Sequence, residues 1–248
     1  MQVVLVRVLG SAGGWPGAGR ACSGYLLEAA GRRVWIDAGT GTLAALRQHC
    51  GIDELDAIWI SHLHPDHCSD LLPLRTFLAY TQAPRIPVYG PPGWADRMDA
   101  FLGRPGAMAP AFEVAELTDR TAYAIGSLRL EAVATHHHVP TFGVRTTVDG
   151  ATLAYTADSG PGPALEHLAA GADLLLAEAF RAVHGQPEDP GVSTPEEAAT
   201  TAAANRVGHL VLTHLHPDAD PARVRHRAGA VFGGRLDLAR PGDTYEVR

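Results

Sequence analysis

The sequence Ser-His-Leu-His-Pro-Asp-His occupies positions 61–67 and directly follows the mostly apolar segment 55–60. It places His62, His64, Asp66 and His67 within six residues. Three imidazoles and a carboxylate at this density are costly in a protein interior unless a charged group lies among them. Zinc and similar borderline metals are bound by these side-chain types. The stretch therefore predicts a metal site at the end of a buried strand.

The spacing inside this stretch favours two metal positions over one. His62 and His64 lie two residues apart at a strand end, so both rings can point the same way as the chain leaves the sheet. Asp66 and His67 turn into the next helix and face a neighbouring point. One loop can therefore supply ligands to two metals.

Composition and charge limit the class of protein. The length of 248 residues allows one large domain or two small ones, and the apolar content of 46% allows a sizeable core. No linker is visible that would split the chain, so a single domain over 1–248 is expected. The net charge of −7 gives no electrostatic reason to bind a nucleic acid polymer. Three cysteines without a CxxC spacing argue against a disulfide framework. Residues 1–10 predict a first strand rather than a signal peptide, and no apolar run approaches membrane-spanning length. A cytoplasmic protein without membrane partners is expected.

Each half of the chain is rich in predicted strands first and in helices later. This order predicts an α/β fold in which two mixed β-sheets pack face to face with helices outside, an αββα sandwich. Helices are expected at 42–49, 66–80, 93–102, 163–170, 194–206 and 221–232. The segments 10–20, 103–110 and 180–192 are expected to be loops.

Metal-ligating residue types also follow other predicted strands. They are the run His136-His137-His138, Asp158, Glu178 and His214. Taken singly, each has an ordinary explanation, since Asp-Ser-Gly at 158–160 suits a turn and a lone histidine is commonly a surface residue. Beside the 61–67 stretch, a shared site at one edge of the sandwich is the better explanation. Asp158, which has two oxygens, can bridge two metals, and such a pair holds a water whose pKa falls toward neutrality.

Together these motifs resemble the metallo-β-lactamase superfamily over essentially the whole chain. The pattern Ser-His-x-His-x-Asp-His after an apolar strand is its signature, and Asp37 in segment 34–39 matches an aspartate that supports the metal loop. Segments 10–26, 137–145 and 210–214 resemble the ribonuclease Z and phosphodiesterase branch.

The resemblance implies two Zn²⁺ ions, with Mn²⁺ or Fe as alternatives. The implied ligands are His62, His64 and His137 for the first metal, Asp66, His67 and His214 for the second, and Asp158 as the bridge. His137 is preferred because it lies eight residues before Arg145, as in that branch, while His136 and His138 stay open as alternatives.

Two departures from ribonuclease Z argue against tRNA processing. Only 20 residues separate His137 from Asp158, which leaves no room for the inserted arm that grips tRNA. The family's Gly-His-Ser-Thr segment reads Gly-Val-Ser-Thr at 191–194, so the histidine that acts at the leaving group is missing although its partner Glu178 is present. His184 or His216 could replace it.

The expected activity is hydrolysis of a small phosphodiester such as a cyclic nucleotide. Asp66 and Glu178 are the predicted catalytic carboxylates, and Glu178 or a nearby histidine would protonate the leaving group. Arg145 and His216 are predicted to bind substrate, with a scaffold role for Arg145 as the alternative. Trp15, Met108 and Phe180 could line an apolar pocket.

Three other outcomes stay open from the sequence. The same metals can act on a thioester, lactone or amide, which makes this the alternative activity. The scaffold also hosts iron-dependent oxygen chemistry and proteins that only bind. A homodimer is left open.

Overall fold

Two β-sheets of seven strands each pack face to face in the computed structural model, which describes residues 3–247. The first sheet contains, in spatial order, β14 (Thr244–Val247), β1 (Val4–Gly10), β2 (Gly24–Ala29), β3 (Arg32–Ile36), β4 (Ala57–Trp59), β5 (Ile86–Gly90) and β6 (Phe112–Glu116). The second contains β13 (Arg235–Leu238), β12 (His209–Thr213), β11 (Leu174–Glu178), β10 (Ala151–Tyr155), β9 (Phe142–Val148), β8 (Leu128–Ala134) and β7 (Thr121–Ile125).

Both sheets are mixed in the same manner. In the first, β14, β1, β2 and β3 pair antiparallel, and β3 to β6 pair parallel. In the second, β7 to β10 pair antiparallel, and β10 to β13 pair parallel. The parallel strands are connected by helices, as parallel pairing requires a crossover.

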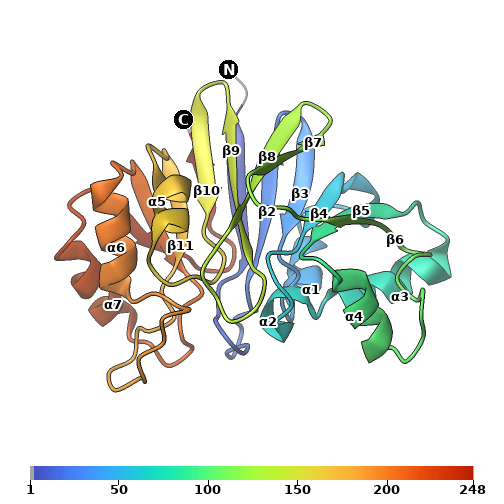
Figure 1. Ribbon diagram of the computed structural model, residues 1–248, viewed down its shortest axis with the longest axis horizontal. Helices are drawn as coiled ribbons and strands as arrows, with labels where there is room; N and C mark the ends of the chain where they lie inside the picture. Colours follow the sequence, from blue (N-terminus) through green and yellow to red (C-terminus); the bar gives the residue numbers. More distant parts are fainter. Residues whose placement is uncertain (1–2, 248) are drawn as a thin grey trace.

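Helices cover the two outer faces (Figure 1). Those beside the first sheet are α1 (Thr42–Leu46), α2 (Pro65–Cys68), α3 (Leu71–Thr81) and α4 (Trp94–Phe101). Those beside the second are α5 (Pro163–Ala169), α6 (Pro195–Ala204) and α7 (Pro221–Gly229). One apolar cluster lies between the two sheets. A second lies between the first sheet and its helices, and a third lies between the second sheet and its helices. The predicted αββα sandwich is confirmed.

The helix predicted over 66–80 is in fact two helices. The break lies at Ser69-Asp70, where the backbone pairs with Ala38 instead of continuing the helix: Ala38 N donates to His67 O at 2.7 Å, and Asp70 N donates to Ala38 O at 2.8 Å. These bonds hold the end of the 61–67 stretch against the residues that follow β3. They thereby fix the position of α2.

Strands β6 and β7 were not predicted. Glu113, Val114 and Glu116 are exposed in β6, which lies at the edge of its sheet. Both strands lie at the edges of their sheets, where one side is unpaired and charged side chains are common. Each strand is also only five residues long, so its pattern is weak. No helix within residues 3–247 is long and apolar enough to cross a membrane.

Candidate metal centre

The predicted ligands gather where strands of both sheets end. Asp37 follows β3, the 61–67 stretch follows β4, and His137, Asp158 and His214 follow β8, β10 and β12. Within each sheet these strands run in the same direction, so their carboxyl ends meet at one edge. Parallel pairing therefore explains why residues far apart in the sequence come together.

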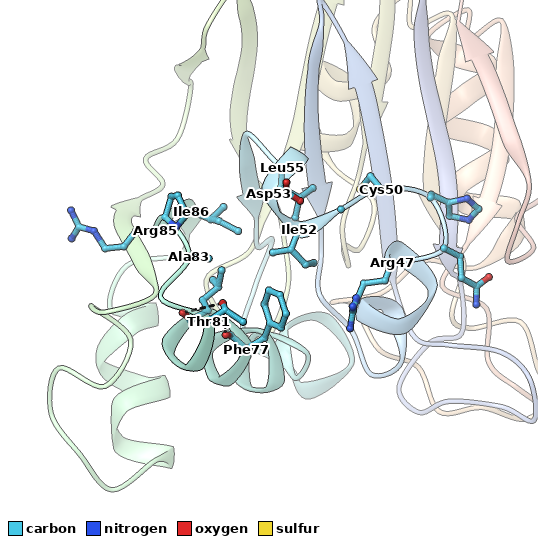
Figure 2. Close-up of a pocket in the computed structure, with 15 residues that line it drawn as sticks. Arg47, Cys50, Ile52, Asp53, Leu55, Phe77, Thr81, Ala83, Arg85 and Ile86 are labelled. Atoms are coloured by element: carbon cyan, nitrogen blue, oxygen red, sulfur yellow. Dashed lines mark hydrogen bonds between the residues drawn. The ribbon is translucent and has the colours of Figure 1, made fainter.

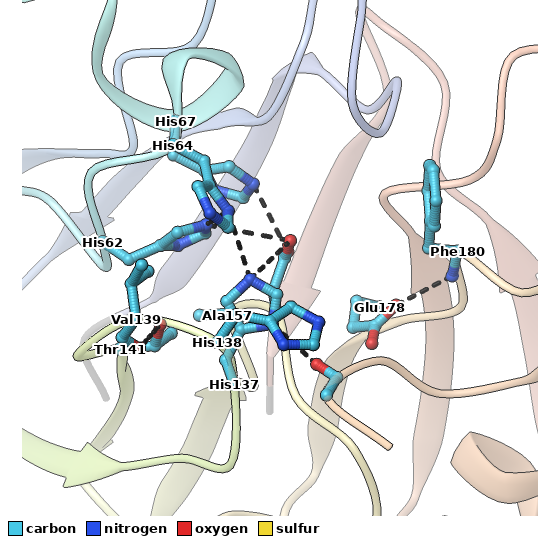
Figure 3. Close-up of polar contacts among 12 residues, drawn as sticks. His62, His64, His67, His137, His138, Val139, Thr141, Ala157, Glu178 and Phe180 are labelled. Atoms are coloured by element: carbon cyan, nitrogen blue, oxygen red, sulfur yellow. Dashed lines mark hydrogen bonds and ion pairs between the residues drawn. The ribbon is translucent and has the colours of Figure 1, made fainter. Parts of the chain in front are cut away.

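His62, His64 and His137 form a first cluster (Figure 3), and an oxygen of Asp158 belongs to the same group of possible ligand atoms. His64 Nδ1 lies 3.1 Å from His62 Nε2 and 3.2 Å from His137 Nε2. Nitrogens bound to one tetrahedral zinc at 2.0–2.1 Å would lie about 3.3 Å apart. The spacing of the three ring nitrogens therefore suits a shared metal ion.

Asp66, His67 and His214 form a second cluster that is fully buried. Asp66 Oδ2 lies 3.0 Å from His214 Nε2 and 3.5 Å from His67 Nε2. Gly14 N also donates to Asp66 Oδ2, at 2.7 Å. The loop between β1 and β2 thus closes over this cluster.

Asp158 lies between the two clusters. Its Oδ1 is 3.3 Å from His67 Nε2 and its Oδ2 is 3.4 Å from His214 Nε2, and Oδ2 also lies 3.8 Å from the nearest nitrogens of His62 and His137. Within residues 3–247, Asp158 Oδ1 and His67 Nε2 are buried without a hydrogen-bond partner. Such orphaned atoms are costly unless something binds them, so the residues present fit a bound metal pair.

Asp37 supports the second cluster through a hydrogen bond from the His67 ring nitrogen that does not face it. Its Oδ1 accepts a hydrogen bond from Ser61 N, and its Oδ2 accepts from His67 Nδ1 and from the hydroxyl of Tyr155, both at 2.7 Å. A histidine that donates its second ring N–H to a carboxylate is fixed in ring orientation and tautomer. His67 Nε2 is therefore left free to bind a metal.

Similar bonds fix two rings of the first cluster. His62 Nδ1 lies 3.0 Å from Ser61 Oγ, which itself donates to Asp37. His137 Nδ1 donates to the carbonyl of Gly191 at 2.6 Å. In both rings Nε2 then carries the lone pair that faces the cluster. Neither Tyr155 nor Gly191 had a sequence signal; Ser61 was part of the motif but had no predicted role.

The histidines of the two clusters differ in the direction in which their pKa values are shifted. Burial lowers the pKa of His62, His64 and His137. Burial also opposes protonation of His67 and His214, but Asp158 and the carboxylates beside each ring outweigh it and raise both pKa values. Protonation is therefore favoured more at the histidines of the second cluster than at those of the first.

Proton release should accordingly differ between the two metals. We expect the second zinc equivalent to release more protons than the first and its affinity to weaken more as pH falls from 8 to 6, because raised pKa values extend proton competition to higher pH. Calorimetric zinc titrations at each pH, in two buffers of different ionisation enthalpy, measure both quantities. Equal proton release by the two equivalents would contradict the assignment.

Of the three consecutive histidines, only His137 reaches the clusters. His138 pairs with Asp189 at 2.9 Å, and its side chain is about half exposed. His136 belongs to neither cluster. The geometry thus agrees with His137 among the alternatives.

Glu178 anchors loops beside the site. Its Oε2 accepts from Phe180 N at 2.7 Å (Figure 3). Its Oε1 accepts from Ser193 N at 2.5 Å. Burial, with a contribution from Asp158, raises the pKa of Glu178 to about 8. Both oxygens are occupied by backbone donors, which gives Glu178 a positioning role here, and its predicted catalytic role stays a prediction.

The hydrogen bonds of Arg145 argue against the prediction that it binds substrate. Its guanidinium donates to the carbonyls of Leu168 and Ala170, at 2.5 and 2.7 Å, at the end of α5. Cations at a helix carboxyl end satisfy carbonyls that lack intrahelical partners. Of the two roles left open, the scaffold role is the one observed.

Replacing Arg145 with methionine separates these roles. We expect the free energy of unfolding to fall by about 1–2 kcal/mol, because two charge-assisted hydrogen bonds are lost at a partly exposed site. We expect kcat/KM to stay within about twofold of the wild type, in line with a substitution remote from the chemistry. Urea denaturation and steady-state kinetics measure both. Unchanged stability with a large loss of kcat/KM would restore the substrate role.

His216 lies beside the second cluster in an aromatic group. Its ring centroid is 4.8 Å from that of Trp15 and 5.3 Å from that of Phe180, and Phe180 also contacts His214 at 5.5 Å. His184, the other candidate for the missing leaving-group histidine, is exposed in the 180–192 loop. Met108 is fully buried in the core beneath the first sheet's helices and lines no part of the site.

A cavity of about 600 Å³ opens elsewhere, between the segment after α1 and the end of α3 (Figure 2). Ile52, Phe77 and Ile86 form part of its apolar wall, and Arg47 lies over the Phe77 ring at 5.6 Å. None of its lining residues belongs to the two clusters. This cavity is therefore separate from the candidate metal centre.

Residues 32–215 match the model of the beta-lactamase superfamily domain, and the chain belongs to this family. The resemblance carried by the 61–67 stretch is thus confirmed.

Several relatives match over nearly the full chain. A protein named ribonuclease Z from Mycobacterium marinum is 31% identical, covering 99% of each chain. The probable metallo-hydrolase YhfI of Bacillus subtilis is 28% identical, and its crystal structure aligns with a TM-score of 0.88 over 98% of this chain and 99% of that one. A diphosphatase of the PhnP family shares the fold, with a TM-score of 0.77 at 22% identity over 99% and 98% of the two chains. These relatives support a metallo-hydrolase.

Proposed function

We propose that this protein is a binuclear zinc hydrolase that cleaves a small phosphodiester, for example a cyclic nucleotide. The position of Asp158 between the two clusters carries the proposal. Its Oδ2 lies 3.4 Å from His214 of the second cluster and 3.8 Å from His62 and His137 of the first, and its Oδ1 lies 3.3 Å from His67. A bridging ligand requires a carboxylate within reach of both clusters in this way. Two bound metals would supply a nucleophilic water and neutralise charge on the phosphoryl oxygens.

The chain's own residues hold this arrangement and manage protons. Asp37 and Ser61 fix the ring tautomers of His67 and His62. Asp218 N lies 3.2 Å from His216 Nδ1 and donates to it, which leaves the proton of a neutral ring on Nε2. The Nε2–H of His216 would donate a hydrogen bond to the oxygen of the leaving group, which makes His216 our candidate to replace the absent family histidine.

A small substrate suits the chain better than a polynucleotide. Only 20 residues separate His137 from Asp158, and the net charge is −7. Relatives named ribonuclease Z and a diphosphatase act on phosphorus–oxygen bonds according to their names. We therefore retain phosphorus as the centre of attack and a small molecule as the substrate.

A carbonyl substrate is the second candidate. Val192 replaces the family's leaving-group histidine, and Glu178 is occupied by backbone donors. A thioester releases a thiolate, which is a better leaving group than the alkoxide of a cyclic nucleotide and needs less help from an acid. This observation favours testing both classes.

A substrate panel tests the proposal. Zinc-loaded protein should hydrolyse bis(p-nitrophenyl) phosphate and at least one 3′,5′- or 2′,3′-cyclic nucleotide. Thioesters, lactones and β-lactams should react with a kcat/KM at least about 100-fold lower, since the site would be complementary to a phosphoryl transition state. Turnover of the carbonyl compounds alone would establish the second candidate and refute the first.

A further inference from the structure

Trp15 differs from the other tryptophans of the chain. Its side chain is 47% exposed, whereas Trp35, Trp59 and Trp94 are 0% exposed. A large exposed aromatic ring beside a candidate site is a feature of ligand recognition more than of packing. Its surroundings show that this exposure is fixed in place.

Backbone bonds tie the loop that carries Trp15 to the second cluster. Gly13 N donates to Leu215 O at 3.0 Å, between His214 and His216, and Gly14 N donates to Asp66 Oδ2 at 2.7 Å. A Cβ atom on Gly13 would lie 2.7–2.8 Å from Phe180 and His214. The loop thus lies directly against these residues.

The ring of Trp15 is held by edge contacts. Its centroid lies 4.8 Å from that of His216 at an interplanar angle of 85°, and 6.4 Å from that of Phe180 at 86°. Perpendicular contacts of this kind use ring edges or one face and leave indole surface free. Trp15 is therefore a rigid, partly exposed aromatic wall next to the second cluster.

We propose that Trp15 stacks on a nucleobase of the substrate, so that the phosphodiester is a nucleotide with its base on the side of the second cluster. This inference rests on the proposed phosphodiesterase function and names its substrate class. Every base has a π-face, and stacking on one aromatic side chain strengthens binding by about tenfold. A fixed ring binds at a lower entropic cost than one that must be ordered.

The test compares two ligands that differ only by the base. Calorimetry on zinc-loaded protein measures the affinities for adenosine 5′-monophosphate and ribose 5-phosphate. In Trp15→Ala we expect the nucleotide to bind about tenfold more weakly and ribose 5-phosphate to bind as to the wild type. Trp15→Phe should keep most of the affinity. Phe101→Ala, which removes a 74% exposed ring on α4, is the matched control and should change neither ligand.

The outcomes separate this inference from the proposed function. Equal nucleotide affinity in Trp15→Ala and wild type would overturn the stacking role while phosphodiester turnover stands. Parallel loss of both ligands in Trp15→Ala and Trp15→Phe would also overturn it, since the effect would then not concern the base. No phosphodiester turnover by the wild type would instead refute the proposed function. Unchanged binding of ribose 5-phosphate shows that the variant site is folded.

Discussion

Asp158→Ala is expected to lower zinc content from two ions per chain to one or fewer and to reduce phosphodiester turnover by at least about 10³-fold. The loss follows from geometry, because the Asp158 carboxylate lies within 3.3–3.8 Å of histidine nitrogens of both clusters. Removing a charged bridge costs several kcal/mol of transition-state stabilisation, and each 1.4 kcal/mol is about tenfold in rate. Metal analysis after gel filtration and initial rates measure the two effects.

Its control is Glu166→Ala, which removes an exposed carboxylate on α5. This variant should keep both zinc ions and wild-type rates. Full activity in Asp158→Ala with two zinc ions still bound would show that the reaction takes place elsewhere.

Asp37→Ala is expected to weaken zinc binding at the second cluster by about 10- to 100-fold. The substitution leaves His67 Nδ1, Ser61 and the Tyr155 hydroxyl without their acceptor inside the protein. Because these groups are buried, the free energy of unfolding should also fall by about 3 kcal/mol or more. Competition with a chelator measures affinity, and urea denaturation of metal-free protein measures stability separately.

Asp56→Ala is the matched control for Asp37→Ala. Asp56 also accepts hydrogen bonds from a backbone N–H, that of Arg33, and from a side chain, that of Arg32. It precedes β4, whereas the 61–67 stretch follows this strand. Asp56→Ala should lower the free energy of unfolding by about 1 kcal/mol and leave the zinc affinity unchanged. Wild-type zinc affinity in Asp37→Ala would contradict the role of Asp37.

The site was predictable because its residue types are costly without a metal. His62, His64 and His67 stand together after a buried strand, and no packing argument explains them. Asp158 and His214 are ordinary residues alone, and they gained meaning only from this stretch. Asp158 follows β10 and His214 follows β12, and the parallel pairing of these strands with β11 brings their carboxyl ends to one edge of the sheet. A shared site at one edge of the sandwich is what the sequence predicts.

Other features depend on three-dimensional neighbours. The contact of Arg145 with the end of α5 and that of Tyr155 with Asp37 join segments far apart in the chain. Nothing local in the sequence marks such pairs. The break between α2 and α3 likewise comes from pairing with Ala38, which overrides a continuous helical pattern.

A zinc titration of hydrolytic activity tests the proposed binuclear site most directly. Metal-free protein receives zero, one and two equivalents, and the initial rate of cyclic nucleotide hydrolysis is measured at each. We expect little turnover at one equivalent and a steep rise toward the second, because a binuclear site needs both clusters and Asp158 together. Full turnover at one equivalent, or none at two, would contradict the proposed binuclear site.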